Sequence, residues 1–447
     1  MDRGMALVFV VPAVLVLVLC SILSLESSGA TAAEAMMEAK VEEDFHTFPS
    51  SQMNDEAIYS LSNLGKWLDY VHETSDTEDE NGANEYQVAE ESQLQTQDNK
   101  KKKNYAKFKP KRTIVVAKDG SGHFQSIQAA INDVPKVNKE RVLIKIKAGV
   151  YSEQVTISRK KRYITLEGER SHKNGSELRT VIEFNATAAD LSKIGVPVRT
   201  FGSATVAVNA KNFIAKYITI KNTAPTPLPG AVGGQAVALR VSADMAAFYV
   251  CRFYGKQDTL YDHMGRHFFK SCYAEGTIDF VFGNGRSLYE SCHLNALENN
   301  GTYGTITAQK RNATSLETGF AFVHSLVTGY GSAFLGRAWG NDSRVVFANT
   351  FMSKVVIPQG WDDWGIPARE KTVFYAEYNC TGPGANSTGR VHWSEQLTFK
   401  QAKPFLSIGF INGKKWLQNP KKLEAEERHS IAAEESQATF GSSPTMN

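Results

Sequence analysis

Four polar segments stand out along the chain because each interrupts sequence that otherwise reads as apolar strand. They contain Gln235, the pair Gln257 and Asp258, Asp279, and Arg337. Asp279 is preceded by Ile and followed by Phe-Val-Phe, where an unpaired charge would be costly to bury. Two carboxylates placed side by side push their pKa values apart, so that one keeps a proton while the other is ionised. Acid–base chemistry requires that division, and Arg337 is a cation that could pair with Asp279.

Each of these residues also has an ordinary structural explanation. An aspartate in a glycine-rich turn usually caps the turn, and glutamines in stacked strands often hydrogen-bond along the stack. The sequence contains none of three common motifs of other enzymes: Gly-X-Ser-X-Gly, His-Glu-X-X-His and the phosphate-binding loop. The chemical interpretation therefore depends on a fold that brings the two aspartates together.

Short strand-like segments, separated by Gly, Asn and Asp, recur through most of the chain. Cys251, Cys272 and Cys292 occupy the same place in three such segments, at a step of about twenty residues that is typical of a solenoid. In a parallel β-helix with one coil per step, the cysteines would form an internal ladder, and Asp258 would lie beside Asp279. The composition and this repeat predict an all-β parallel β-helix. An antiparallel sandwich is the alternative.

A helix is expected where this solenoid begins. Phe124, Ile127, Ile131 and Val134 lie at helical spacing, and Pro135 follows them. A solenoid needs its ends covered, so this segment is predicted to be a short N-terminal capping helix.

The first residues, 1–32, have the layout of a secretory signal. Arg3 precedes an apolar run from Met5 to Leu25, and small residues follow the run. The run also reaches the length of a membrane-spanning helix, so an uncleaved anchor is the alternative.

Charge divides the rest of the chain into a leader at 33–112, a compact domain at 113–420 and a polar tail at 421–447. The leader is acidic from Glu34 to Asn99 and basic from Lys100 to Arg112, and its composition favours disorder. The whole chain has a formal net charge of +3, so the acidic leader leaves the remainder basic. A basic surface suits an acidic polymer as the partner, although it is also compatible with an ordinary solvated surface.

Several further features agree with secretion. Four cysteines lie beyond the signal, and none forms a Cys-X-X-Cys pair typical of metal sites, so disulfides are possible but their pairing is not fixed by sequence. The Asn-X-Ser/Thr triplets of N-glycosylation begin at Asn174, Asn185, Asn300, Asn312, Asn341, Asn379 and Asn386.

The four polar segments, in this order and at these separations, resemble the pectin methylesterase family of plants and bacteria. The segments Gly149–Glu153 and Ser203–Val206 resemble two further parts of that family, and the resemblance runs from about Thr113 to about Pro420. It implies a right-handed parallel β-helix that hydrolyses the methyl esters of cell-wall galacturonan and releases methanol.

The resemblance also implies a role for each site residue. Asp279 is expected to be the nucleophile and Asp258 the general acid and then base, with Gln257 and Gln235 as oxyanion donors and Arg337 holding Asp279. Gln235 and Arg337 are also expected to contact substrate, together with Thr205, Trp339 and Trp361. No metal and no organic cofactor are expected.

The implied partner is methyl-esterified pectin, with a proteinaceous inhibitor as a second candidate. Nucleic acid is not expected, nor is a membrane once the signal is cleaved, and the chain is expected to be a secreted monomer of the plant cell wall. Alanine replaces the family's frequent proline before Trp339. The leader lacks the family's cysteine-bearing inhibitor-like domain, which places the chain in the subgroup without it. No cysteine lies near 324–326, so the family's usual disulfide is in doubt.

Two other functions remain open on the sequence alone. A polygalacturonase or pectin lyase would also be a β-helix, and it would cleave the polymer chain instead of releasing methanol. A wall-binding protein without activity is the second alternative, and the presence of every expected catalytic residue argues against it.

Overall fold

The computed structural model describes residues 108–170, 178–228, 230–299 and 301–417. The predicted signal, nearly all of the leader and the tail lie outside the described residues. No helix within the described ranges has both the length and the apolar character needed to cross a membrane.

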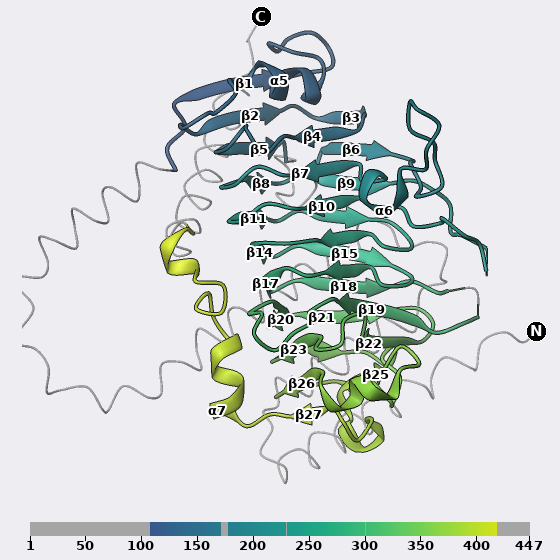
Figure 1. The fold of residues 1–447 in the computed structure, drawn as a ribbon. Coiled ribbons are helices and arrows are strands. Elements are labelled where there is room, and N and C mark those ends of the chain that lie inside the picture. The colour runs from purple at the N-terminus through teal and green to yellow at the C-terminus, as the bar shows by residue number, and fades with distance from the viewer. Residues whose placement is uncertain (1–107, 171–177, 229, 300, 418–447) are drawn as a thin grey trace, which may run out of the picture. The chain divides into compact units, whose positions relative to one another are not determined.

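Three parallel sheets form the body of the protein, and the chain visits them in turn once per coil (Figure 1). Every ladder that joins the named strands is parallel, which excludes the sandwich and confirms the predicted right-handed parallel β-helix.

The strands of each sheet follow in their spatial order. Sheet A comprises β1 (Arg112–Val116), β2 (Val142–Ile146), β5 (Ile164–Gly168), β8 (Ile214–Lys216), β11 (Ala246–Tyr249), β14 (Arg266–Lys270), β17 (Arg286–Glu290), β20 (Gly319–Val323), β23 (Arg344–Ala348), β26 (Phe374–Tyr378) and β27 (Glu395–Gln396). Sheet B comprises β3 (Gly149–Ser152), β6 (Thr180–Phe184), β9 (Thr219–Asn222), β12 (Arg252–Tyr254), β15 (Tyr273–Gly276), β18 (His293–Ala296), β21 (Leu326–Gly329) and β24 (Phe351–Met352). Sheet C comprises β4 (Val155–Ile157), β7 (Val206–Val208), β10 (Leu239–Val241), β13 (Leu260–Asp262), β16 (Val281–Gly283), β19 (Gly304–Gln309), β22 (Ala333–Arg337) and β25 (Trp361–Asp362).

Like residues stack above one another inside the coils. Phe248, Phe269, Tyr289, Phe322 and Phe347 form a continuous aromatic stack with ring centroids 4.5–4.8 Å apart. The three cysteines of the repeat are buried beside one another as free thiols, which confirms the predicted ladder. The interior is thus a set of one-residue columns, each running along the axis of the β-helix.

The predicted capping helix is present as α5 (Ile127–Asp133), and its apolar face covers the first coil. Glu153 fixes its start: Oε1 accepts from the Ile127 N–H at 2.8 Å, and Oε2 accepts from the Gln128 N–H at 3.0 Å and the Ser126 hydroxyl at 2.8 Å. A carboxylate at this helix end is favoured by both the free N–H groups and the helix dipole. The Gly149–Glu153 segment therefore anchors the cap.

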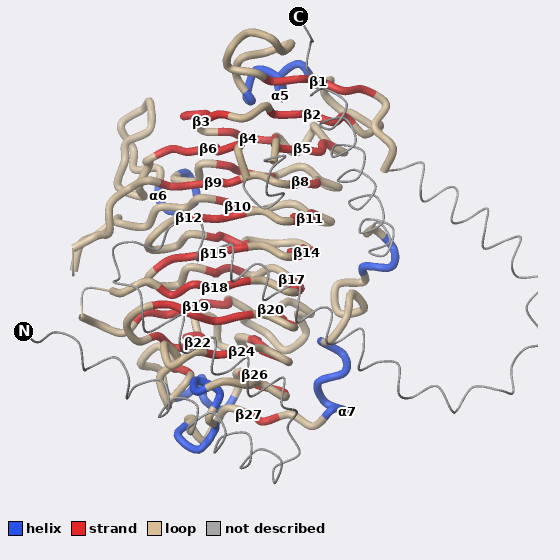
Figure 2. Tube along the Cα trace, turned by 180° about the vertical axis from the view of Figure 1, so that it is seen from behind, coloured by secondary structure: helices blue, strands red, loops and turns tan. Residues whose placement is uncertain are grey.

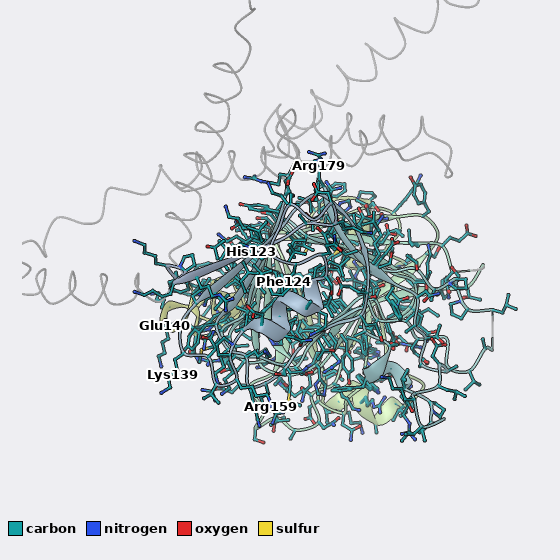
Figure 3. All side chains as sticks on the ribbon, turned by 90° about the horizontal axis from the view of Figure 1, so that it is seen from above. His123, Phe124, Lys139, Glu140, Arg159 and Arg179 are labelled. Atoms are coloured by element: carbon teal, nitrogen blue, oxygen red, sulfur yellow. The ribbon has the colours of Figure 1, made fainter. Side chains whose placement is uncertain are left out.

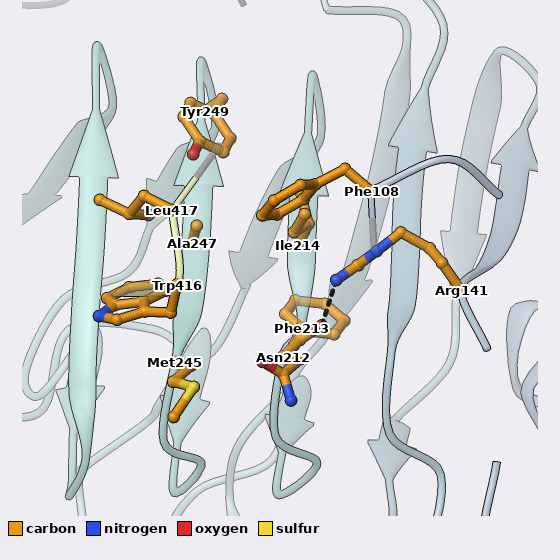
Figure 4. A pocket seen from close by; sticks show the side chains of 10 residues that line it. All are labelled: Phe108, Arg141, Asn212, Phe213, Ile214, Met245, Ala247, Tyr249, Trp416 and Leu417. Carbon is orange, nitrogen blue, oxygen red and sulfur yellow. Dashed lines mark hydrogen bonds between the residues drawn. The ribbon is translucent and has the colours of Figure 1, made fainter. Parts of the chain in front are cut away.

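The C-terminal segment packs against sheet A, as the tube view shows beside β26 and β27 (Figure 2). Its helical turns are α7 (Phe399–Ala402), η4 (Lys403–Phe405) and η5 (Gly413–Lys415). The segment ends near Phe108, and Figure 4 shows the small pocket between them, which has room for about one water molecule. The remaining short helices are α6 (Arg199–Gly202), η1 (Pro367–Lys371), η2 (Pro383–Ala385) and η3 (Ser387–Gly389).

Candidate active site

Two equivalent turns, one before β13 and one before β16, carry the two aspartates. The Asp258 N–H donates to the Ile278 carbonyl at 3.1 Å, and the Thr277 N–H donates to the Lys256 carbonyl at 3.0 Å. The turn that carries Asp279 is therefore hydrogen-bonded directly onto the turn that carries Asp258. The structure brings the two carboxylates into neighbouring coils, as the repeat predicted.

Both aspartates have left-handed backbone conformations. The φ angle is 66° at Asp258 and 51° at Asp279. Non-glycine residues rarely adopt these angles, although Asp tolerates them better than most, and such strain is often found at functional sites. Here the left-handed turn ends the preceding segment, and a strand of sheet C begins two residues after each aspartate.

Arg337 holds Asp279 from the C-terminal end of β22. Its Nε donates to Oδ1 at 2.7 Å and its Nη2 donates to Oδ2 at 2.6 Å, so both carboxylate oxygens are bound. The Asp279 side chain is only 8% exposed, and that of Arg337 is 29% exposed. A planar guanidinium is suited to this two-point contact, which lysine could not reproduce.

The surroundings separate the two carboxyl groups in acidity. Burial raises the pKa of Asp258 well above its ordinary value, and the negative charge of Asp279 adds to the rise. Burial also raises the pKa of Asp279, but the hydrogen bonds and charge of Arg337 oppose that rise directly, while Asp362 adds to it. Asp258 therefore keeps its proton to higher pH than Asp279, and Asp279 is the group held as a carboxylate.

Two glutamines lie one register position apart in successive coils, just before β10 and β13. Gln235 and Gln257 are both half-buried, and the Ala236 N–H donates to the Gln257 carbonyl at 3.1 Å, which ties the two segments together. Within the part of the chain that the structure describes, no hydrogen bond engages either side-chain amide. Both amides therefore keep their hydrogen-bonding capacity for a bound ligand.

Aromatic rings cover the outer face of sheet C beside the carboxylates. Tyr261 stacks on Phe282 at 4.2 Å, Trp339 lies 6.0 Å from Phe282, and the guanidinium carbon of Arg337 lies 3.9 Å above the ring of Trp364. Tyr261 and Phe282 are paired in register across β13 and β16. These rings make an apolar wall of the kind that sugar rings stack against.

Three members of this wall, Tyr261, Phe282 and Trp364, were not predicted from the sequence. A signal for two of them was present, since Tyr261 and Phe282 each follow a site aspartate by three residues in consecutive repeats. Phe201, which lies near this wall, was not predicted as a site residue either. It lies 5.5 Å from the His263 ring, with the guanidinium of Arg240 3.5 Å above it.

Two of the expected sugar contacts are buried elsewhere in the fold. Trp361 is 1% exposed and stacks on Tyr375 at 4.5 Å inside the core, because side chains alternate along β25 and its neighbour Asp362 takes the outward position. Thr205 is 0% exposed, and its hydroxyl donates to the Lys221 carbonyl at 2.9 Å. Both side chains are thus shielded from solvent, whereas Trp339 lies half-buried at the wall, and contact of any of the three with the sugar stays a prediction.

Taken together, the site contains a carboxylate held by arginine, a neighbouring carboxyl group whose pKa is raised, two amides without a hydrogen-bond partner among the described residues, and an aromatic wall. This set suits nucleophilic attack on a carbonyl carbon, followed by proton delivery to the leaving group. Among the residues that the structure describes, no group of three His, Cys, Asp or Glu side chains is arranged to hold a metal ion.

Comparisons with known proteins agree on one family. The family model described as Pectinesterase matches residues 113–414. Probable pectinesterase 49 of Arabidopsis thaliana is 46% identical over 311 residues, which cover 69% of this chain and 82% of that protein. Pectinesterase QRT1 of the same plant is 42% identical over 308 residues, which cover 69% of this chain and 79% of that protein.

Solved structures show the same likeness. The pectin methylesterase from carrot matches with a TM-score of 0.62 at 35% identity, covering 69% of this chain and 95% of the carrot chain. A pectin methylesterase in complex with a hexasaccharide matches with a TM-score of 0.57 at 30% identity, covering 67% of this chain and 96% of that chain.

Proposed function

Because the chain belongs to the pectinesterase family and hydrolyses the methyl esters of pectin, we propose that Asp279 is the nucleophile of this reaction and Asp258 its general acid and base. One observation carries the assignment. Arg337 donates hydrogen bonds to both oxygens of Asp279, but it acts on Asp258 only through its positive charge. Asp258 therefore keeps its proton to higher pH than Asp279. The two neighbouring carboxyl groups thus begin the reaction in different protonation states, with Asp279 ionised and Asp258 protonated.

In the first half of the reaction, a carboxylate oxygen of Asp279 attacks the carbonyl carbon of the methyl ester. The free amides of Gln235 and Gln257 donate to the oxygen that becomes negative. Asp258 gives its proton to the departing methoxy oxygen, so methanol leaves and an acyl-enzyme anhydride remains on Asp279.

In the second half, the ionised Asp258 takes a proton from water, and the resulting hydroxide attacks the sugar carbonyl of the anhydride. The same two amides stabilise the second oxyanion. Collapse of this intermediate releases the Asp279 carboxylate, which returns to Arg337, and frees a galacturonic acid that loses its proton to solvent. Asp258 ends the cycle protonated, as it began.

We also propose that the enzyme is secreted to the plant cell wall after cleavage of the segment at 1–32, and that it acts there as a monomer subject to a proteinaceous inhibitor. The leading apolar run supports secretion. So does the position of the described asparagines that begin glycosylation triplets, all of which are exposed: Asn185, Asn312, Asn341, Asn379 and Asn386.

The direct test of the proposed function uses the purified full chain and highly methylated pectin. Methanol should appear in a one-to-one ratio with new carboxylates, and no new reducing ends or unsaturated ends should form. Chain cleavage without methanol would instead identify a polygalacturonase or a lyase. Binding without either product would identify a wall-binding protein.

The arginine carries a separate prediction. Arg337→Lys keeps the charge but loses one of the two hydrogen bonds to Asp279, so we expect kcat to fall about ten- to hundredfold. Weaker pairing leaves the effect of burial on Asp279 less opposed, which raises its pKa further. The acid limb of the pH–rate profile should therefore move to higher pH, as measured by initial rates across the acidic range.

Arg266→Lys is the matched control for this variant. Arg266 binds Asp244 with the same two-point geometry, at 2.9 Å and 2.7 Å, but it lies on β14 of sheet A, away from the site carboxylates. It should leave both kcat and the acid limb unchanged. Full activity and an unmoved acid limb in Arg337→Lys would show that Arg337 has only a structural role.

A further inference from the structure

Three consecutive turns at the N-terminal end of the β-helix are stacked on one another. They are residues 134–141 between α5 and β2, 158–163 between β4 and β5, and 209–213 between β7 and β8. The Val137 N–H donates to the Lys160 carbonyl at 2.8 Å, and the Tyr163 N–H donates to the Lys211 carbonyl at 3.2 Å. We call this set the cationic turns.

The cationic turns carry a large excess of positive charge at the surface. Their one exposed carboxylate is Glu140. Their exposed cations number six: Lys136, Lys139, Arg159, Lys160, Arg162 and Lys211. No ion pair within the described ranges joins any of these six to a carboxylate.

Two later turns of the same column are different, because each contributes a carboxylate that pairs with an arginine. Arg266 binds Asp244 at 2.7 Å, and Arg286 binds Glu317. Like charges repel when they are held together, so an unpaired group of six cations carries a free-energy cost that an anionic ligand would relieve. The excess charge is therefore a local property of the first three turns.

Buried groups hold these turns in fixed positions. Lys161 is 8% exposed, and its ammonium donates to the Asn132 carbonyl at 2.9 Å and to the Val134 carbonyl. Arg141 is also buried and donates to the Asn212 carbonyl at 3.1 Å, which joins the first turn to the third (Figure 4).

The backbone of the turns is also constrained. The φ angle is 63° at Val137, a conformation that is costly for a β-branched residue, and 58° at Tyr163. Viewed from the N-terminal end, Lys139 and Arg159 project from one edge of the molecule and Arg179 from the opposite edge (Figure 3). The cations of the turns are thus presented by a rigid surface.

This surface continues from the catalytic sheet. The second and third turns follow β4 and β7, which are strands of sheet C. β4 is three strands away from β13, about 14 Å at the usual spacing of parallel strands. The aspartates precede strands of sheet C and the turns follow them, so the turns lie at the opposite edge of this sheet, and a polymer chain that leaves the aspartates reaches them by crossing sheet C obliquely.

We propose that the cationic turns bind a stretch of galacturonan that has already lost its methyl esters. This inference rests on the proposed function, since the ligand is the product of the reaction. Each completed hydrolysis leaves one carboxylate on the polymer, so consecutive hydrolyses produce a row of negative charges. The cations stand in rows about 4.8 Å apart, one coil per row, and can meet such a polymer at several points. The methylated substrate carries no charge and gains nothing there, so the surface distinguishes product from substrate and keeps the enzyme on the stretch it has demethylated.

The test measures binding of polygalacturonate, which has no methyl esters and cannot be turned over, to the full chain by titration calorimetry. One variant replaces four cations of the turns by glutamine: Lys139, Arg159, Lys160 and Arg162. The matched control makes the same change at four exposed lysines near the C-terminal end: Lys354, Lys371, Lys400 and Lys403. At low salt we expect the first variant to lose affinity about tenfold, from several exposed ion pairs of modest strength, and the control to bind like the unchanged protein. The difference should shrink as salt rises, because exposed charges are screened.

Two further measurements complete the test. Methanol release from a short, fully methylated oligomer, which does not extend from the aspartates to the turns, should be the same in both variants. Amide hydrogen exchange of the unchanged protein should slow in residues 134–141 and 158–163 when polygalacturonate is added, a readout that does not depend on either variant folding. Equal affinities of variant and control, or exchange that does not change in these turns, would overturn the proposal. Loss of methanol release with polygalacturonate binding intact would contradict the proposed function and leave the binding surface standing.

Discussion

Asp279→Asn is expected to abolish turnover, lowering kcat by roughly four orders of magnitude or more, as is usual when a nucleophile is removed. The amide is nearly the same size as the carboxylate, but it cannot form the acyl intermediate. It also offers Arg337 only one oxygen in place of two. The largely buried guanidinium therefore loses one hydrogen-bond acceptor and the negative charge that balances its own. Methanol release from methylated pectin measures the loss, and a thermal unfolding curve shows how much stability the unpaired arginine costs.

Asp362→Asn provides the comparison for that variant. Asp362 lies opposite Arg337 in the register of β22 and β25 and affects Asp279 through its charge. Its replacement should keep most of the turnover. Because its charge raises the pKa of Asp279, its removal should move the acid limb slightly to lower pH. Similar, small losses in the two variants would refute the assignment of the nucleophile.

Gln257→Ala is expected to lower kcat roughly a hundred- to a thousandfold, the usual effect of removing one oxyanion donor, with little change in KM. The side chain is half-buried next to Asp258, and its amide has no partner among the described residues, so its hydrogen-bonding capacity is available to the reacting oxygen. An interaction that forms only as negative charge develops affects the rate more than the binding of the ester. Initial rates over a range of pectin concentrations separate the two effects.

Gln396→Ala is the matched control, because Gln396 presents the same amide on an exposed position of β27 in sheet A. It should leave both constants unchanged. A rise in KM without a fall in kcat for Gln257→Ala would mean that this glutamine binds substrate and does not stabilise the oxyanion.

The stacking of the two aspartates was predictable because it depends only on the length of the repeat. Asp258 and Asp279 are separated by the same number of residues as Cys251 and Cys272, so a one-coil step that aligns the thiols also aligns the carboxylates. Bidentate binding of Asp279 by Arg337 could not be obtained in this way. The two residues are 58 positions apart, and turns of irregular length lie between them. Resemblance to a family supplied that pair, and the structure supplied its geometry.

The burial of Trp361 has a physical cause. Trp361 was expected to contact the sugar, and whether its side chain faces outward depends on which of the two residues of β25 points out of the coil. Asp362 takes the outward position beside Arg337, which sends Trp361 into the core against Tyr375. A strand of two residues carries too little pattern for that orientation to be read from sequence.

The grouping of the cationic turns could not be predicted from the sequence either, because it depends on contacts between segments far apart in the chain. The sequence showed that the body of the chain is basic. The cations that gather at the surface come from segments 136–139, 159–162 and 211, and only the coiling of the chain places them together. Pairing is equally invisible in sequence, because Asp244 neutralises Arg266 from the neighbouring coil.

The construction of the site by successive coils has a consequence for how this gene can change over generations. An insertion within a turn lengthens one coil and leaves every strand in its place, so a turn away from the site, such as the one at residues 310–318, is where length can vary. Duplication or deletion of a whole coil between β16 and β22 is a different event. It would displace Arg337 from Asp279 by one strand spacing, about 4.8 Å, and break contacts of 2.6 Å and 2.7 Å. Selection therefore fixes the number of coils between the nucleophile and its arginine, while the lengths of the turns around them remain open to variation.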